Sequence, residues 1–201
     1  MSSKTLISNL ALGHIAASKE IGNLETDKSK EAQVCRRFYA PMISEVFRDF
    51  DWPFARKYAD LGLIEADPNE EWDFSYRYPS DCSRAIKILS GTRNDTRQSR
   101  VPYARGGDSV GSIIYTDKED AQLKYILNNV SENSFTSDFV MMASFLLAGY
   151  IAPSVTDGDP FKLGERALNI YIVSKNKAES TSYNEQQADE DPESEFIRSR
   201  G

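Results

Sequence analysis

The chain has 201 residues, of which 40% are apolar and 27% charged, and its 31 acidic residues outnumber its 24 basic ones to give a formal net charge of −7. This length and composition are typical of one globular domain, with or without a tail. They exclude a protein that binds nucleic acid through bulk positive charge, because neutralising phosphates requires clustered Lys and Arg. An acidic wall can still repel DNA and let it slide past.

The first 51 residues predict two helices. Ser3 is suited to cap the first helix, which we expect to stop at the Gly-Asn pair at 22–23. The Thr-Asp pair at 26–27 can cap the second helix, in which apolar pairs recur every three or four residues over 34–50. Because Pro41 falls inside this pattern, we expect a kink or a break there.

Residues 52–130 change to the alternating pattern that is typical of strands. Trp, Phe and Tyr alternate with polar residues over 72–78, and shorter apolar runs follow at 85–89 and 123–127. The Gly-Gly-Asp sequence at 106–108, between apolar runs at 101–103 and 113–115, predicts a hairpin. We therefore expect a small antiparallel sheet.

The remaining residues predict two more helices and a tail. The first helix covers 137–151, is apolar on nearly every side and is expected to end at Pro153, and the second begins at Asp159 or Pro160. The stretch 139–152 is too short to span a membrane, so we expect no membrane span. Residues 181–201 carry six acids and few apolar residues, a composition that predicts disorder.

Together these elements predict an α+β fold. About four helices form a bundle from residues 1–51 and 131–180, residues 52–130 form an inserted β-rich region, and residues 181–201 form a flexible acidic C-terminal arm. The N-terminal residues lack the apolar core of a signal peptide. Cys35 and Cys82 are too few for a disulfide framework or a zinc site, which fits synthesis in a reducing cytoplasm.

A search for catalytic chemistry gives no candidate. His14 is the single histidine and has no acidic neighbour in sequence, so a nucleophilic triad is not predicted. The glycine-rich loop at 106–111 lacks the Lys of a phosphate-binding loop, and the acid pairs at 70–71 and 119–120 lack calcium-loop spacing. We therefore expect neither an enzyme nor a bound cofactor or metal.

One stretch of the β region is rich in arginine. Arg93, Arg97, Arg100 and Arg105 follow Arg84 closely, and they are candidates for contact with DNA or with an acidic partner. The same stretch also contains Asp95 and Asp108, so a solvated polar loop is the alternative.

Four motifs in this order resemble a known family. They are Glu20-Ile21-Gly22-Asn23-Leu24; Phe50-Asp51-Trp52-Pro53-Phe54-Ala55-Arg56; Trp72 through Tyr76-Arg77-Tyr78-Pro79-Ser80-Asp81-Cys82; and Ile113 through Tyr125, Phe135 and Phe139 to Leu147-Ala148-Gly149-Tyr150-Ile151-Ala152. They resemble the tail tubular protein A family, the head-to-tail adaptors of short-tailed phages. The resemblance spans about residues 5–178, and the acidic tail has no counterpart in it.

The resemblance implies a structural virion protein at the head–tail junction. Its partners would be copies of itself in a ring, expected to be twelvefold, the portal protein, the tail nozzle or other tail proteins, and genomic double-stranded DNA passing through the channel. Phe196, Ile197 and Arg198 are expected to dock on the portal, or else they only end a flexible tail. The alternatives are a head-completion or stopper protein of another tail type, a non-phage protein-binding module, or an enzyme with an unrecognised carboxylate site.

Overall fold

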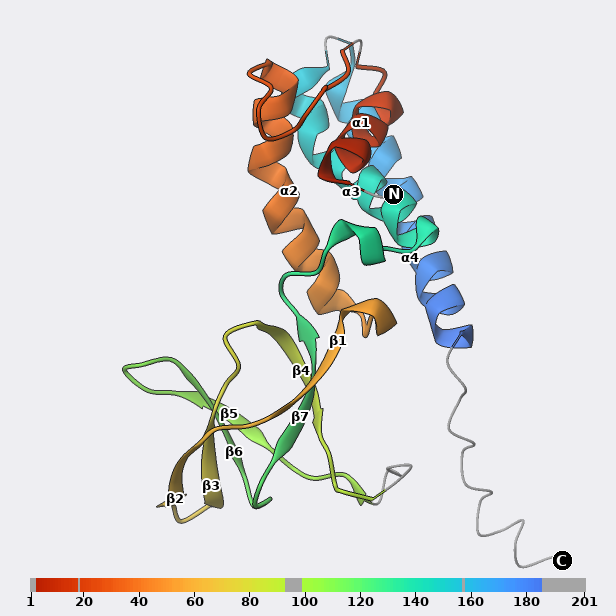
Figure 1. Cartoon of the computed structure of the whole chain (residues 1–201). Helices are drawn as coiled ribbons and strands as arrows, with labels where there is room; N and C mark the ends of the chain where they lie inside the picture. The colour runs from red at the N-terminus through yellow and green to blue at the C-terminus, as the bar shows by residue number, and fades with distance from the viewer. Residues whose placement is uncertain (1–2, 18, 93–98, 157, 186–201) are drawn as a thin grey trace, which may run out of the picture.

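A computed structural model describes residues 3–17, 19–92, 99–156 and 158–185. These residues form four α-helices and two antiparallel sheets, so the expected α+β fold is confirmed. The helices pack together at one end of the molecule and the strands lie at the other (Figure 1). The helices are α1 (Lys4–His14), α2 (Lys30–Asp49), α3 (Ser137–Val155) and α4 (Pro160–Asn184).

The strands make two sheets, not the single sheet that the sequence predicted. They are β1 (Arg56–Asp60), β2 (Leu63–Asn69), β3 (Trp72–Arg77), β4 (Cys82–Ile88), β5 (Ala104–Gly107), β6 (Ser112–Thr116) and β7 (Gln122–Leu127). One sheet has the order β1-β7-β4 and the other β2-β3-β6-β5. The expected hairpin is formed by β5 and β6, but Gly106 and Gly107 belong to strand β5 and pair with Ile113 and Ser112.

Helix α1 is shorter than predicted. Ser3 caps it as expected, with its hydroxyl accepting from the Leu6 amide at 3.1 Å, but the helix ends at His14, well before Gly22. Ala16 adopts a positive φ of 54°, which turns the chain out of the helix. The residues after this turn fold back beside α1, where Asn9 bonds the backbone of Ile21. Ile21 is therefore buried as part of a loop and not as part of a helix.

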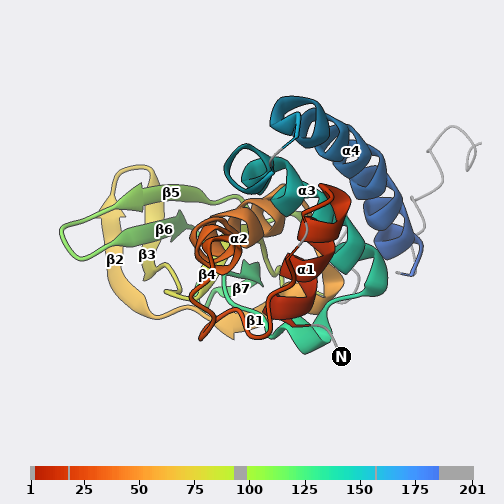
Figure 2. The same cartoon turned by 90° about the horizontal axis from the view of Figure 1, so that it is seen from above.

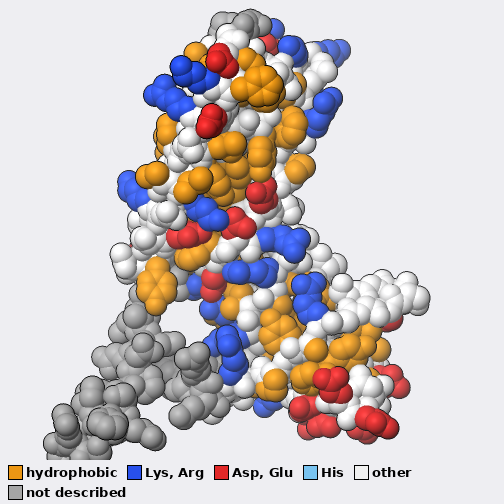
Figure 3. All heavy atoms as spheres, turned by 180° about the vertical axis from the view of Figure 1, so that it is seen from behind, with side chains coloured by type: hydrophobic (Ala, Val, Ile, Leu, Met, Phe, Trp, Pro, Cys, Tyr) orange, Lys and Arg blue, Asp and Glu red, His pale blue; other side chains and the backbone are white. Residues whose placement is uncertain are grey.

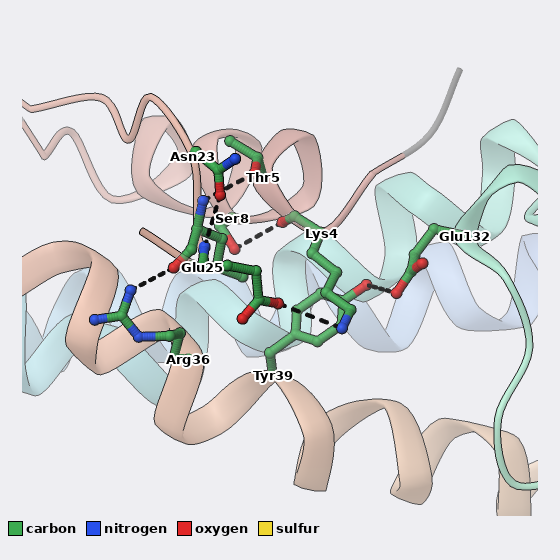
Figure 4. Close-up of polar contacts among 9 residues, drawn as sticks. Lys4, Thr5, Ser8, Asn23, Glu25, Arg36, Tyr39 and Glu132 are labelled. Carbon is green, nitrogen blue, oxygen red and sulfur yellow. Dashed lines mark hydrogen bonds and ion pairs between the residues drawn. The ribbon is translucent and has the colours of Figure 1, made fainter. Parts of the chain in front are cut away.

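The loop between α1 and α2 is held by polar contacts (Figure 4). The Leu24 amide donates to Thr5 Oγ1 at 3.0 Å, and Lys4 Nζ lies 3.4 Å from Glu25 Oε1. The Arg36 guanidinium donates to the Leu24 carbonyl from α2. The bonds from Thr5 and Arg36 satisfy the backbone amide and carbonyl of Leu24, which lies outside any helix or strand.

Helix α2 begins later than predicted and runs through its proline. Its cap is Ser29, whose hydroxyl accepts from the Ala32 amide at 3.3 Å, and not Thr26 or Asp27. We predicted a kink or a break at Pro41, and the break does not occur, since the helix continues to Asp49. The buried Met42, on the face that packs into the core, helps to hold the helix together despite the missing N–H.

The two C-terminal helices pack against each other, and both run past their predicted ends. Pro153 lies inside the last turn of α3, which continues to Val155. Asp159 caps α4 as predicted, and α4 extends to Asn184, so residues 181–184 are helical and not part of an arm. Ser182 is still buried, because this turn keeps packing on the protein.

Helix α3 forms the centre of the helical core. It packs against α1, α2 and α4, and its buried residues include Phe139, Met142 and Leu147. Among the described residues, α3 is the one helix that is both long enough and apolar enough to cross a bilayer. However, 67% of its most apolar window is buried inside the protein. That burial is typical of the core helix of a folded domain.

The bundle and the β part meet at an aromatic cluster. Phe47 packs against Phe135 and Phe139, and the buried Trp52 packs edge-on against Phe139 at 5.0 Å and near Phe54 at 6.0 Å. Trp52 Nε1 donates to the Val46 carbonyl at 2.9 Å, so its polar atom is also satisfied. This cluster fixes the end of α2 against the start of α3.

The β part has a separate and smaller core between its two sheets. Leu61, Tyr76, Ile114, Leu123 and Tyr125 are its principal buried residues. Ile126 and Ile86 point the other way and pack on the helical core. The β1-β7-β4 sheet therefore lies between the two cores.

Candidate functional site

The turn 78–82 joins β3 of one sheet to β4 of the other. Its Asp81 carboxylate accepts from Lys57 Nζ at 2.7 Å and from the Tyr125 hydroxyl at 2.9 Å. The Asp81 carbonyl accepts from the Asn128 amide at 2.8 Å. One side chain of the Tyr-Pro-Ser-Asp-Cys motif thus ties strands β1 and β7 to the turn.

The charges around Asp81 reinforce one another. The hydrogen bond from Lys57 lowers the pKa of Asp81, and the Tyr125 hydroxyl adds to this effect. The same contact with Asp81 raises the pKa of Lys57. Burial, followed by the bond to Asp81, raises the pKa of Tyr125. Asp81 is therefore held ionised as a structural acceptor.

A second charged pair, Arg77–Asp108, begins at the residue just before this turn. Arg77 donates to both oxygens of Asp108, each at 2.9 Å, and Asp108 also accepts from the Val110 and Gly111 amides. The bidentate bond from Arg77 holds the pKa of Asp108 far below its usual range. Between the two pairs lies an open groove of about 870 Å³.

The groove also contains a thiol and a phenol that are held neutral. Cys82 Sγ donates to the Tyr78 hydroxyl at 3.1 Å. Burial raises the pKa of Tyr78 to about 12 and also raises the pKa of Cys82. A thiol with a raised pKa is a poor nucleophile. The arrangement suits binding of a polar segment better than attack on a substrate.

His14, for which the sequence predicted no catalytic role, does not line this groove. His14 stacks on Phe145 with ring centroids 3.8 Å apart, and its Nε2 lies 2.9 Å from Ser144 Oγ. Burial lowers the pKa of His14. Within residues 3–17, 19–92, 99–156 and 158–185, no group of three or more His, Cys, Asp or Glu side chains could hold a metal ion.

The predicted arginine cluster is described only in part. Arg105 lies over the Tyr78 ring, with Cζ 4.5 Å from the ring centroid, and lines the groove. Arg100 is exposed beside Val101, which bridges to Ile88. Arg93, Arg97, Phe196, Ile197 and Arg198 lie outside the described residues.

Helix α4 presents an apolar outer face. Phe161 is 77% exposed, Ile172 56%, Val173 70% and Tyr183 63%. Figure 2 shows α4 on the outside of the bundle, with α3 between it and α2. We name these four exposed side chains the α4 outer face.

The apolar residues Phe161 and Val173 do not lie on the packed side of this helix. The buried stripe is Gly164, Ala167, Tyr171 and Ala178, at spacings of three, four and seven residues. Phe161, Ile172 and Val173 fall off this stripe, which is the signal that could have shown them to be exposed. Beside them lies a shallow hollow of about 620 Å³ lined by Lys162, Glu165, Arg166, Asn169, Ile170 and Val173.

No protein-family model and no curated protein matches this chain.

Proposed function

We propose that this chain is a non-enzymatic head-to-tail adaptor subunit of a tailed phage, which forms a ring between the portal and the tail around the DNA channel. The resemblance of its motifs to the tail tubular protein A family supports this function. The α4 outer face is the observation that carries the proposal, because large apolar side chains exposed along one helix are typical of a surface that a partner covers.

The dimensions of this face suit a contact between copies. A helix of 25 residues is about 37 Å long, and the exposed apolar residues run from its first turn to its last. Covering four such side chains removes apolar area from water. This burial stabilises the contact by roughly 25 cal/mol per Å², before the costs of association. The net charge of −7 favours a channel through which DNA passes without sticking.

Assembly with the portal protein from the same genome tests the proposal. Mass photometry and negative-stain microscopy of the mixture are expected to show rings of this chain on the portal. A chain that stays monomeric beside the portal, or that is missing from mature particles, would contradict the adaptor function. A purified chain that turns over a small molecule would contradict the non-enzymatic part.

A matched pair of variants tests the α4 outer face. Val173→Glu places a charge in the proposed contact and is expected to prevent ring formation. Ala40→Glu makes the same charge change at an exposed position of α2 and is expected to leave the rings intact. Equal assembly of the two variants would show that α4 is not the contact surface.

A further inference from the structure

The two acids that flank the groove of the β part are already neutralised. Lys57 and the Tyr125 hydroxyl both donate to Asp81, and Arg77 donates to both oxygens of Asp108. Asp108 also accepts from two backbone amides. Because their oxygens are occupied, these two carboxylates offer little to a basic ligand.

Arg105 is a cation of this groove that has no acid beside it. Among the described residues it forms no ion pair, and its guanidinium lies over the Tyr78 ring. A cation–π contact uses no hydrogen-bond acceptor, so the N–H donors of Arg105 remain free to bond a ligand. The charge already acts on its surroundings. Burial raises the pKa of Tyr78 and of Cys82, and the Arg105 charge acts on both groups in the opposite direction.

The strand that carries Arg105 is packed closely against its neighbour. In β5, Arg105 pairs with Ile114 and Gly106 pairs with Ile113. A Cβ on Gly106 would lie 2.6 Å from Cε2 of the Tyr115 ring, so a side chain at this position would displace that ring. The backbone of Arg105 is therefore held in place before a ligand arrives, which reduces the ordering that binding costs.

The rest of the groove suits an extended peptide. Its lining includes the apolar residues Leu61, Pro79 and Val110, of which Val110 is 79% exposed. The exposed residues Ser80 and Ser112 add hydroxyl groups to the same lining. Ligand sites combine apolar walls with a few polar groups in this way, and their volumes include the 870 Å³ of this groove.

The acids beside the groove limit how many charges a ligand can carry. Asp60 lines the groove and also lines a neighbouring hollow together with Glu119 and Asp120. Figure 3 shows Asp and Glu side chains gathered at the tip of the β part that lies far from the bundle. A nucleic acid carries a charge on every phosphate and would be repelled there. A peptide with a single carboxylate avoids most of this repulsion.

We propose that the groove binds an extended segment of a partner protein, in which one Asp or Glu flanked by apolar residues pairs with Arg105. A carboxylate can accept parallel N–H bonds from one guanidinium, which fixes its position as well as its charge. The groove lies in the β part and the α4 outer face lies on the bundle, so this site does not depend on ring formation. It gives each copy a second contact surface, for a partner other than its own copies.

Titration of the full ¹⁵N-labelled chain with synthetic peptides, followed by NMR, tests the site. The probes are acetyl-Gly-Leu-Glu-Leu-Gly-amide and two matched peptides with Gln or Lys in place of Glu. At about 1 mM, the Glu peptide is expected to shift the amide signals of Arg105, Gly111 and Ser112. The Gln and Lys peptides should bind at least about fivefold more weakly. Equal binding of the three peptides, or shifts from none of them, would overturn the proposal.

A matched pair of variants assigns the binding to one side chain. Arg105→Gln removes the charge at an exposed position and is expected to weaken the Glu peptide at least about fivefold. Arg37→Gln makes the same change on the exposed side of α2 and should leave the affinity unchanged. Tyr78→Phe keeps the ring beneath the guanidinium and should also bind as the native chain does. An Arg105→Gln variant that binds as tightly as the Arg37→Gln variant would show that Arg105 is not the anchor.

Competition distinguishes a peptide from a nucleic acid. A single-stranded oligonucleotide is expected to leave the signals of the bound Glu peptide unchanged, and displacement of the peptide would overturn the choice of ligand. These titrations use the free chain without the portal. Their failure would therefore leave the ring proposal standing, and loss of rings in the Val173→Glu variant would leave this site standing.

Discussion

The helical bundle and the β part are stabilised in different ways. The bundle core is continuous and apolar, and α3 is buried on several sides by its neighbours. The β core is smaller, and around it the strands are joined by ionised pairs such as Lys57–Asp81 and Arg77–Asp108. The bundle should therefore respond most to changes of volume, and the β part to changes of pH and salt.

The largest effect is expected at the aromatic cluster between the two parts. Trp52→Ala removes a fully buried indole and should lower the free energy of unfolding by about 3–5 kcal/mol, measured by urea denaturation. Phe161→Ala removes an exposed ring and serves as the control, with a change within about 0.5 kcal/mol. Similar losses in both variants would mean that this cluster does not hold the bundle together.

A smaller effect is expected where α3 and α4 approach closely. A Cβ on Gly149 would lie 2.6 Å from Leu168 Cγ, so Gly149→Ala forces the helices apart and should destabilise the bundle by about 1–3 kcal/mol. Gly13→Ala meets no atom within 4 Å in α1 and should stabilise the chain by up to about 1 kcal/mol. Thermal unfolding followed by circular dichroism distinguishes these opposite signs.

The β part should lose less from one polar change, and the loss should depend on pH. Asp81→Asn weakens the bond from Lys57 and should cost about 1 kcal/mol at pH 7, because water screens a partly exposed pair. Since the folded pKa of Asp81 is lowered, its contribution is present above the unfolded pKa of about 3.9 and is lost as pH falls through the folded pKa. The variant should therefore show a shallower loss of stability in acid, measured by denaturation at pH 2–7.

The smallest effect is expected at the exposed clamp. Arg77→Ala leaves Asp108 with its backbone donors and should cost less than Asp81→Asn does, with the difference from the native chain shrinking in 1 M salt. Arg37→Ala, an exposed arginine on α2, is the control. A loss as large as that of Trp52→Ala would break the distinction between the two parts.

The sequence predicted the element types better than their ends. The apolar period of α2, the continuous apolar run of α3 and the alternation in β3 were sufficient to place these elements. The end of α1 was missed because it depends on the backbone of Ala16, which adopts a left-handed conformation that no residue type there signals. Pro41 was read as a kink or a break and Pro153 as a helix end, but both helices continue through these residues because their neighbours pack in the core.

The candidate surfaces were harder to predict than the fold. Arg105 was named from the sequence, but its position over Tyr78 depends on the tertiary structure, which brings β5 close to the turn between β3 and β4. The α4 outer face was not identified from the sequence, because the exposed apolar residues can be told from the buried ones only by their angular distance from the Gly164, Ala167, Tyr171 and Ala178 stripe.

The strands that enter and leave the β part are neighbours. Arg56, the first residue of β1, pairs with Ile126 near the end of β7, so the chain leaves the bundle and returns to it at almost the same point. A short linker from the end of α2 to the residues after β7 could therefore replace the β part without moving the helices. The inserted part can therefore grow, shrink or be exchanged among descendants of this gene while the helical scaffold keeps its shape.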